Sequence, residues 1–111
     1  MGKIESYLGF ALRKKSVVKG FNAISYEKGK ARLLILCESA SENAVKEAKS
    51  LAKRLHIPLL VSKQPLEELV HKENCKLIAI TDRDLARAIS EHTDENFAFV
   101  REDTENQYGR E

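Results

Sequence analysis

The sequence predicts an α/β fold: a three-layer α/β/α sandwich around a small mixed β-sheet of about four strands. Two features lead to this prediction. Short runs of consecutive apolar residues, typical of strands that are covered on both faces, alternate with segments whose apolar residues recur every three or four positions. Such alternation is the pattern of β-α-β units, in which helices cover both faces of the sheet. The 111 residues suffice for one domain, expected over residues 1–100, and residues 101–111 form a polar, acidic tail.

The N-terminal third is expected to contain two helices joined by an extended link. Apolar side chains follow a helical period early in the chain, and basic residues close the first helix, where cations suit the helix dipole. We expect a helix over 3–14, an extended link at Val17 and Val18, and a brief helix over 21–28 that Gly29 ends.

The remaining elements alternate between apolar runs and capped helices. Ser39 and Glu42 form an S-x-x-E capping pattern, Pro65 is expected at the first position of a short helix, and Asp82 is expected to cap the last helix. The expected strands are 32–37, 58–61, 77–80 and 97–100, and the expected helices have their buried residues within 44–55, 66–70 and 85–89.

Charge is distributed unevenly along the chain. The formal net charge is only +2, but residues 1–32 hold eight basic side chains against two acidic ones, a balance of +6. Residues 91–111 hold seven acids against two arginines, a balance of −5. A basic segment of this kind favours a polyanionic partner, because contacts to phosphate supply most nonspecific affinity for nucleic acid. A merely solvated surface is the alternative, and we also hypothesise that the acidic tail covers the basic edge when RNA is absent.

The sequence offers no set of residues for catalysis. It contains no nucleophile elbow, no phosphate-binding P-loop and no dinucleotide fingerprint, and its three histidines are isolated from one another. His71 and Cys75 lack a second pair of metal ligands at zinc spacing. Asp82 and Asp84 would diverge on a helix, so a cap and a solvated carboxylate explain them. We expect no enzyme, cofactor, metal or small-molecule substrate.

The cysteines and the apolar segments indicate the compartment. Cys37 and Cys75 form no recognisable disulfide framework, which fits buried free thiols in a reducing environment. No apolar run approaches the length of a membrane span, and the first residues do not resemble a secretory signal. We therefore expect a cytoplasmic protein without a membrane.

Most aromatic side chains are interpreted as packing residues. Tyr7, Phe10 and Phe21 lie at positions expected to face the core. Tyr26 has two interpretations, packing or stacking on a nucleobase beside the lysines, and packing is preferred.

The order of segments resembles a known family, the small kink-turn RNA-binding ribosomal proteins of the large-subunit seven-Ae and thirty-e group, including their short bacterial relatives. The resemblance rests on five segments taken together in order. They are LGFALRKKSVVKG (8–20), GKARLLIL (29–36), SASENAVK (39–46), IPLLVSK (57–63) and IAITD (78–82). It implies an α/β/α fold whose Gly-x-Asn helix start binds a kinked RNA stem.

The resemblance and the charge pattern together give a candidate RNA-binding set. Gly20 and Asn22 match the family motif, Lys63 matches the lysine after the second apolar strand, and an asparagine amide can both donate to and accept from a base edge. The predicted RNA-binding residues are Lys14, Lys15, Lys19, Gly20, Asn22, Lys28, Lys30, Arg32 and Lys63.

Four residues depart from the family pattern. Ala23 replaces the glutamate that usually follows the asparagine, and Tyr26 occupies a basic position. Glu67 and His71 stand where the family commonly has two glycines, and Glu67 would repel phosphate if it faced the RNA.

The leading functional hypothesis, from the resemblance and the charge pattern, is a noncatalytic binder of structured RNA, such as ribosomal RNA, associated with the ribosome. The alternative is a module on the same scaffold that has lost RNA recognition and binds a ribosomal or other protein.

Overall fold

The computed structural model describes residues 2–100, except for the side chain of Lys28. The predicted acidic tail, residues 101–111, lies outside the described residues, as does the hypothesis that this tail covers a basic edge.

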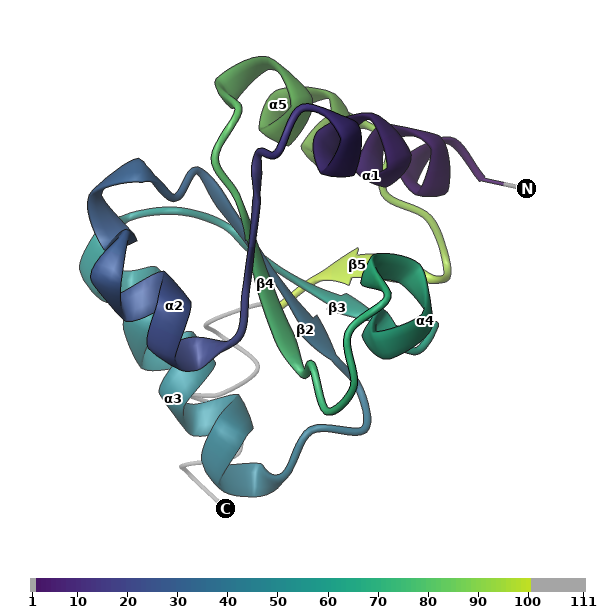
Figure 1. Cartoon of the computed structure of the whole chain (residues 1–111). Coiled ribbons are helices and arrows are strands. Elements are labelled where there is room, and N and C mark those ends of the chain that lie inside the picture. The colour runs from purple at the N-terminus through teal and green to yellow at the C-terminus, as the bar shows by residue number, and fades with distance from the viewer. Residues whose placement is uncertain (1, 101–111) are drawn as a thin grey trace.

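Helices and short strands alternate along the chain as the sequence predicts (Figure 1). In order they are α1 (Lys3–Arg13), β1 (Val17–Lys19), α2 (Phe21–Tyr26), a 3-10 turn (Lys28–Lys30), β2 (Leu33–Cys37), α3 (Glu42–Leu55), β3 (Leu59–Ser62), α4 (Leu66–Val70), β4 (Leu77–Ile80), α5 (Arg83–Glu91) and β5 (Phe97–Phe99). No helix within residues 2–100 is both long enough and apolar enough to cross a membrane.

The sheet is mixed and has five strands in the order β1-β4-β2-β3-β5. Only β2 and β3 run parallel, with Leu34 opposite Leu59, and the other neighbours are antiparallel. The strand beyond the expected four is β1. Val17 and Val18, which we predicted as a link, pair with β4 and thereby form one edge of the sheet.

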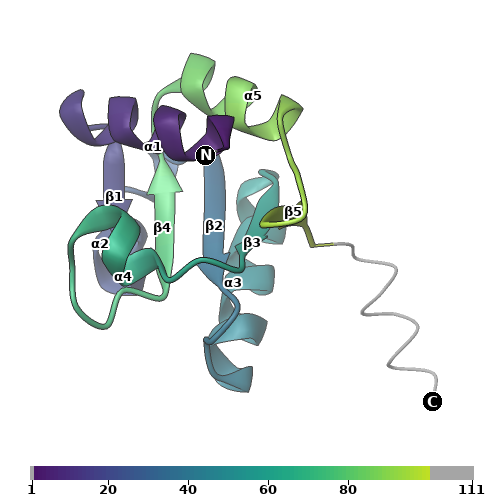
Figure 2. The ribbon, with the colours of Figure 1, turned by 90° about the vertical axis from the view of Figure 1, so that its right-hand side faces the viewer.

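Helices cover both faces of the sheet and give the predicted three layers. Figure 2 looks onto the face that carries α1, α4 and α5, and α2 and α3 lie behind the sheet. Successive residues of β2 point to opposite faces, so Ile35 enters the core beneath α1, α4 and α5, whereas Leu34 and Leu36 enter the core beneath α2 and α3. This explains why the sequence of β2 is apolar without alternation.

Three local details differ from the expected ones. Ser41, not Ser39, caps α3, because its hydroxyl accepts the N–H of Ala44. The second helix ends at Tyr26 and does not reach Lys28, because Glu27 leaves the helical conformation (φ −114°, ψ 27°) and residues Lys28–Lys30 form a 3-10 turn. Pro65 occupies the N-cap of α4, one position before the expected one. Asp82 caps α5 as predicted, accepting the N–H of Leu85.

The register of the strands defines two ends of the sheet, which we name by one residue each. At the Gly20 end, β1, β2 and β3 finish and β4 and β5 begin, so that Lys19, Cys37 and Ser62 lie near Leu77. At the Arg32 end, the same three strands begin and the other two finish. Arg32 there donates its backbone N–H to Ile80. The helix α2 runs from the first end towards the second (Figure 1).

Candidate nucleic-acid interface

Gly20 forms the turn between β1 and α2 at the Gly20 end. Its dihedral angles, φ 92° and ψ 155°, lie in a region that is open almost exclusively to glycine. Its N–H donates to the carbonyl of Leu77 (2.8 Å) and its own carbonyl accepts the N–H of Ile24 (3.0 Å). The turn is therefore fixed to β4 on one side and begins the first hydrogen-bonded turn of α2 on the other.

The first residues of α2 present unpaired backbone donors. In the described part of the chain, the N–H groups of Phe21, Asn22 and Ala23 donate to no protein acceptor, as the geometry of a helix start requires. The side chain of Asn22 is exposed. Unpaired amides at the positive end of a helix favour a negatively charged ligand, although α2 is only six residues long. Asn22 thus faces solvent, as an RNA-binding asparagine must.

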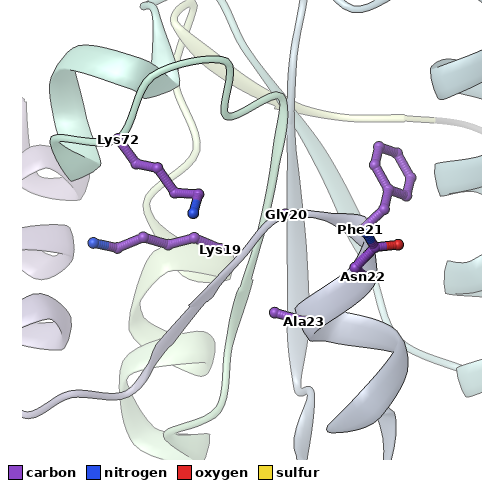
Figure 3. A pocket seen from close by; sticks show the side chains of 6 residues that line it. All are labelled: Lys19, Gly20, Phe21, Asn22, Ala23 and Lys72. Carbon is purple, nitrogen blue, oxygen red and sulfur yellow. The ribbon is translucent and has the colours of Figure 1, made fainter.

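A hollow of about 320 Å³ lies beside this turn. It is lined by Lys19, Gly20, Phe21, Asn22, Ala23 and Lys72. Figure 3 shows the side chains of Lys19 and Lys72 on one side of Gly20 and those of Phe21 and Asn22 on the other. Two lysines therefore line the hollow, and within residues 2–100 the ammonium group of neither lies within 4.0 Å of a carboxylate.

The loop that carries Lys72 is held by backbone geometry and by one carboxylate. His71 and Asn74 adopt the left-handed conformation, with φ near 58° and 59°. His71 thus takes, at some conformational cost, a geometry that glycine adopts more easily. The Glu67 carboxylate accepts the N–H of Asn74. The Glu67 side chain is therefore held within its own loop by this hydrogen bond.

Two further lysines belong to the Gly20 end. Lys63 follows β3 and is exposed, and its backbone N–H donates to Asn96 (2.8 Å). Three strand spacings separate it from β1, which corresponds to about 14 Å. Lys76 precedes β4, and its Nζ donates to the hydroxyl of Ser39 (2.9 Å). Lys72 and Lys76 are absent from the predicted set, because their only signal in the sequence is their place in the polar segment that leads to an apolar strand.

The other predicted cations lie at the Arg32 end. Lys14 and Lys15 end α1 just before β1, and Lys30 and Arg32 precede β2. The backbone of Lys28 begins the 3-10 turn that precedes β2. The structure therefore does not gather the nine predicted residues into one rim. It leaves Lys19, Gly20, Asn22 and Lys63 at one end of the sheet and the remaining five at the other.

Acidic side chains accompany the cations of the Arg32 end. The ammonium of Lys14 forms an ion pair with the carboxylate of Asp82, which also caps α5. This hydrogen bond raises the pKa of Lys14 and, together with the N–H of Leu85, lowers the pKa of Asp82. Lys30 lies 4.0 Å from Glu27. Part of the positive charge at this end is therefore compensated by the protein itself.

The aromatic residues divide into packed and exposed ones. Tyr7 and Phe21 pack against the two cores, as predicted. Phe10 does not, because its position on α1 leaves it 51% exposed, with the guanidinium of Arg13 over its ring (4.8 Å). The packing interpretation of Tyr26 is also wrong, because α2 turns this residue outward and leaves it 92% exposed.

The thiols are free and buried, as expected. Burial disfavours the thiolate of Cys37, but hydrogen bonds with Ser39 and the backbone and the charge of Lys76 outweigh it and hold the pKa of this thiol below its ordinary value. Burial raises the pKa of Cys75. Among residues 2–100, no three histidine, cysteine or acidic side chains gather as metal ligands.

Comparison with known proteins gives one family and a fold. The model of the "Ribosomal protein L7Ae/L30e/S12e/Gadd45 family" matches residues 2–90. A solved structure titled as a protein with unknown function from Bacillus halodurans superimposes with a TM-score of 0.74 at 22% identity, over 82% of this chain and 96% of that one. This likeness shows the shared fold alone. No curated protein sequence matches.

Proposed function

Since this chain belongs to the ribosomal protein L7Ae/L30e/S12e/Gadd45 family, we propose that it is a noncatalytic protein that binds structured RNA through the Gly20 end of its sheet. Membership of the family supports RNA binding of the ribosomal-protein type in general. The finer proposal is that the RNA contains a kink-turn, that the protein acts in the cytoplasm, and that it associates with the ribosome.

One observation carries this proposal: the turn at Gly20 combines unpaired amides, an exposed Asn22 and two lysines that have no acidic partner among residues 2–100, and these residues line one hollow. The amides and the lysines attract phosphate without reading sequence. Asn22 adds a side chain that can donate and accept on one base edge. Charge and directional hydrogen bonding therefore occur together at this end.

The direct test compares three RNAs at several salt concentrations. The RNAs are a kink-turn stem, the same stem with its sheared G·A pairs disrupted, and a plain duplex of equal length. We expect tightest binding to the kink-turn stem and a decline of affinity with salt for all three. Equal affinities would leave only nonspecific attraction. No binding at moderate salt would contradict the proposal and favour the alternative of a protein-interaction module.

Asn22→Ala separates recognition from attraction. The exposed position makes a loss of stability small, about 0.5 kcal/mol or less. We expect the preference for the kink-turn stem over the disrupted stem to fall by roughly five- to tenfold, while binding to the plain duplex stays within twofold, because loss of one good base contact costs about 1–3 kcal/mol. Specific binding that survives Asn22→Ala unchanged would place the recognition site elsewhere.

A further inference from the structure

The outer face of α2 continues past Asn22 to a second exposed side chain. Phe21 and Ile24 point towards the sheet, and the positions between them point away from it. Asn22 and Tyr26 are four residues apart, and this spacing places them next to each other, one turn apart, on the same face of a helix. Tyr26 is therefore the nearest aromatic side chain along the outer face of this helix.

Tyr26 gains almost nothing from its own protein. The residue is 92% exposed, and within the described residues no aromatic or cationic group lies over its ring and no hydrogen bond involves its side chain. Phe10, by contrast, has one face covered by Arg13. Both faces of the Tyr26 ring are thus open to a ligand.

The surroundings of Tyr26 suit a nucleic acid more than an apolar partner. Asn22 and the unpaired amides lie one turn before it, and the only acidic neighbour in the next turn, Glu27, is near Lys30. Its neighbour in sequence, Ser25, is polar and exposed as well. A planar ring beside phosphate-binding donors is the arrangement that holds an unstacked base.

Resting on the function proposed above, we propose that Tyr26 is a stacking platform for an unpaired nucleobase, adjacent to the phosphate contacts made at Gly20 and Asn22. The ligand is an extruded or single-stranded nucleotide of any sequence, because every base has a stackable face. Bases inside a duplex are already stacked on both sides and are excluded. Tyr26 thereby adds a preference for bulged over fully paired RNA.

The test uses the full chain, a stem with a central bulge that carries 2-aminopurine, and a fully paired stem of the same length. We expect Tyr26→Ala to lower affinity for the bulged stem roughly tenfold, to leave the slope of affinity against salt unchanged, and to abolish quenching of 2-aminopurine fluorescence. Tyr26→Phe should keep both affinity and quenching. Tyr26→Lys should steepen the salt slope without restoring the quenching.

The matched control is Phe10→Ala, which removes the other exposed ring of a helix, on the opposite layer, and should leave all RNA measurements within twofold. If the wild type binds the bulged stem and Tyr26→Ala binds it with an affinity within twofold of the wild type, the stacking role is overturned and the proposed function stays intact. Failure of the wild type to bind any RNA would overturn the proposed function itself, and the stacking role with it.

Discussion

The Gly20 end and the Arg32 end of the sheet both carry several lysines or arginines, but they differ in what accompanies those charges. At the Gly20 end, Lys19 and Lys72 border a hollow beside unpaired amides. At the Arg32 end, Lys14 is paired with Asp82, and Lys30 is near Glu27. A count of cations therefore does not locate a binding site. We propose the Gly20 end as the site because its lysines line a hollow beside unpaired amide donors.

The largest expected effect concerns the backbone at the Gly20 end. Gly20→Ala should lower the free energy of unfolding by about 1–3 kcal/mol, because the dihedral angles of Gly20 are strained for any residue with a Cβ. Space is not the cause, since an added Cβ would meet nothing within 4 Å. Denaturant unfolding measures the change.

Gly29→Ala is the control for this prediction. Gly29 also has open space around a Cβ, but its φ is not positive, and it lies in the turn that leads to the Arg32 end. We expect a change within about 0.5 kcal/mol. Equal losses for the two variants would show that the turn at Gly20 needs no glycine.

Removing equal charge from each end tests the comparison itself. We compare two double variants, each of which lowers the net charge by two. The first combines Lys19→Gln with Lys72→Gln at the Gly20 end, and the second combines Lys15→Gln with Arg32→Gln at the Arg32 end. We expect the first pair to weaken binding to structured RNA roughly tenfold at low salt and to reduce the salt slope by about one to two, because up to two phosphate contacts are lost. The second double variant should lower the affinity for structured RNA by less than a third as much as the first. A second pair as damaging as the first would mean that RNA spans both ends.

The smallest effect concerns the ion pair at the Arg32 end. Asp82→Ala removes both the cap of α5 and the partner of Lys14, and should lower stability by about 1 kcal/mol at pH 7. Asp82→Asn keeps the cap and removes only the charge, so it should lose less. Because the side chain of Lys14 is largely exposed to solvent, the ion pair itself is expected to contribute little.

The pH dependence of this effect follows from the two pKa shifts. The lowered pKa of Asp82 gives a contribution that is present above its ordinary pKa of 3.8 and is lost as the pH falls through the lower folded value. The raised pKa of Lys14 gives a second contribution to stability, which is lost only as the pH rises above 10.5. Urea unfolding at pH 7 and pH 3 should show the wild type and Asp82→Asn converging in acid. An undiminished gap at pH 3 would contradict the assignment.

The fold was predictable because each element carries its own local pattern. The unbroken apolar run of β2 requires cover on both faces, and the acidic cap at Asp82 marks the start of α5. The strand at Val17 was not recognised, because three residues are too few to show a period and the pairing of β1 depends on β4, which lies some sixty residues later.

The candidate site was predictable only in part. Gly20 and Asn22 are neighbours in sequence, so a local motif identifies them. Lys72 reaches the same hollow only because β4 pairs with β1, and the ion pair between Lys14 and Asp82 likewise joins residues 68 positions apart. Contacts of this kind are set by strand order, which a single sequence does not display. Charges that are close along the chain were therefore placed in one predicted RNA-binding set, although the strands carry them to opposite ends of the sheet.

The direction in which the chain leaves the sheet has a practical consequence. Val100 donates its N–H to Leu59 (2.9 Å), so the backbone departs from β5 at the Arg32 end. A biotin or affinity handle attached directly at Val100 would anchor the molecule to a sensor chip by the Arg32 end of the sheet, opposite to the end that carries Gly20. Immobilised in that orientation, the protein would offer its hollow to dissolved RNA without steric interference from the support.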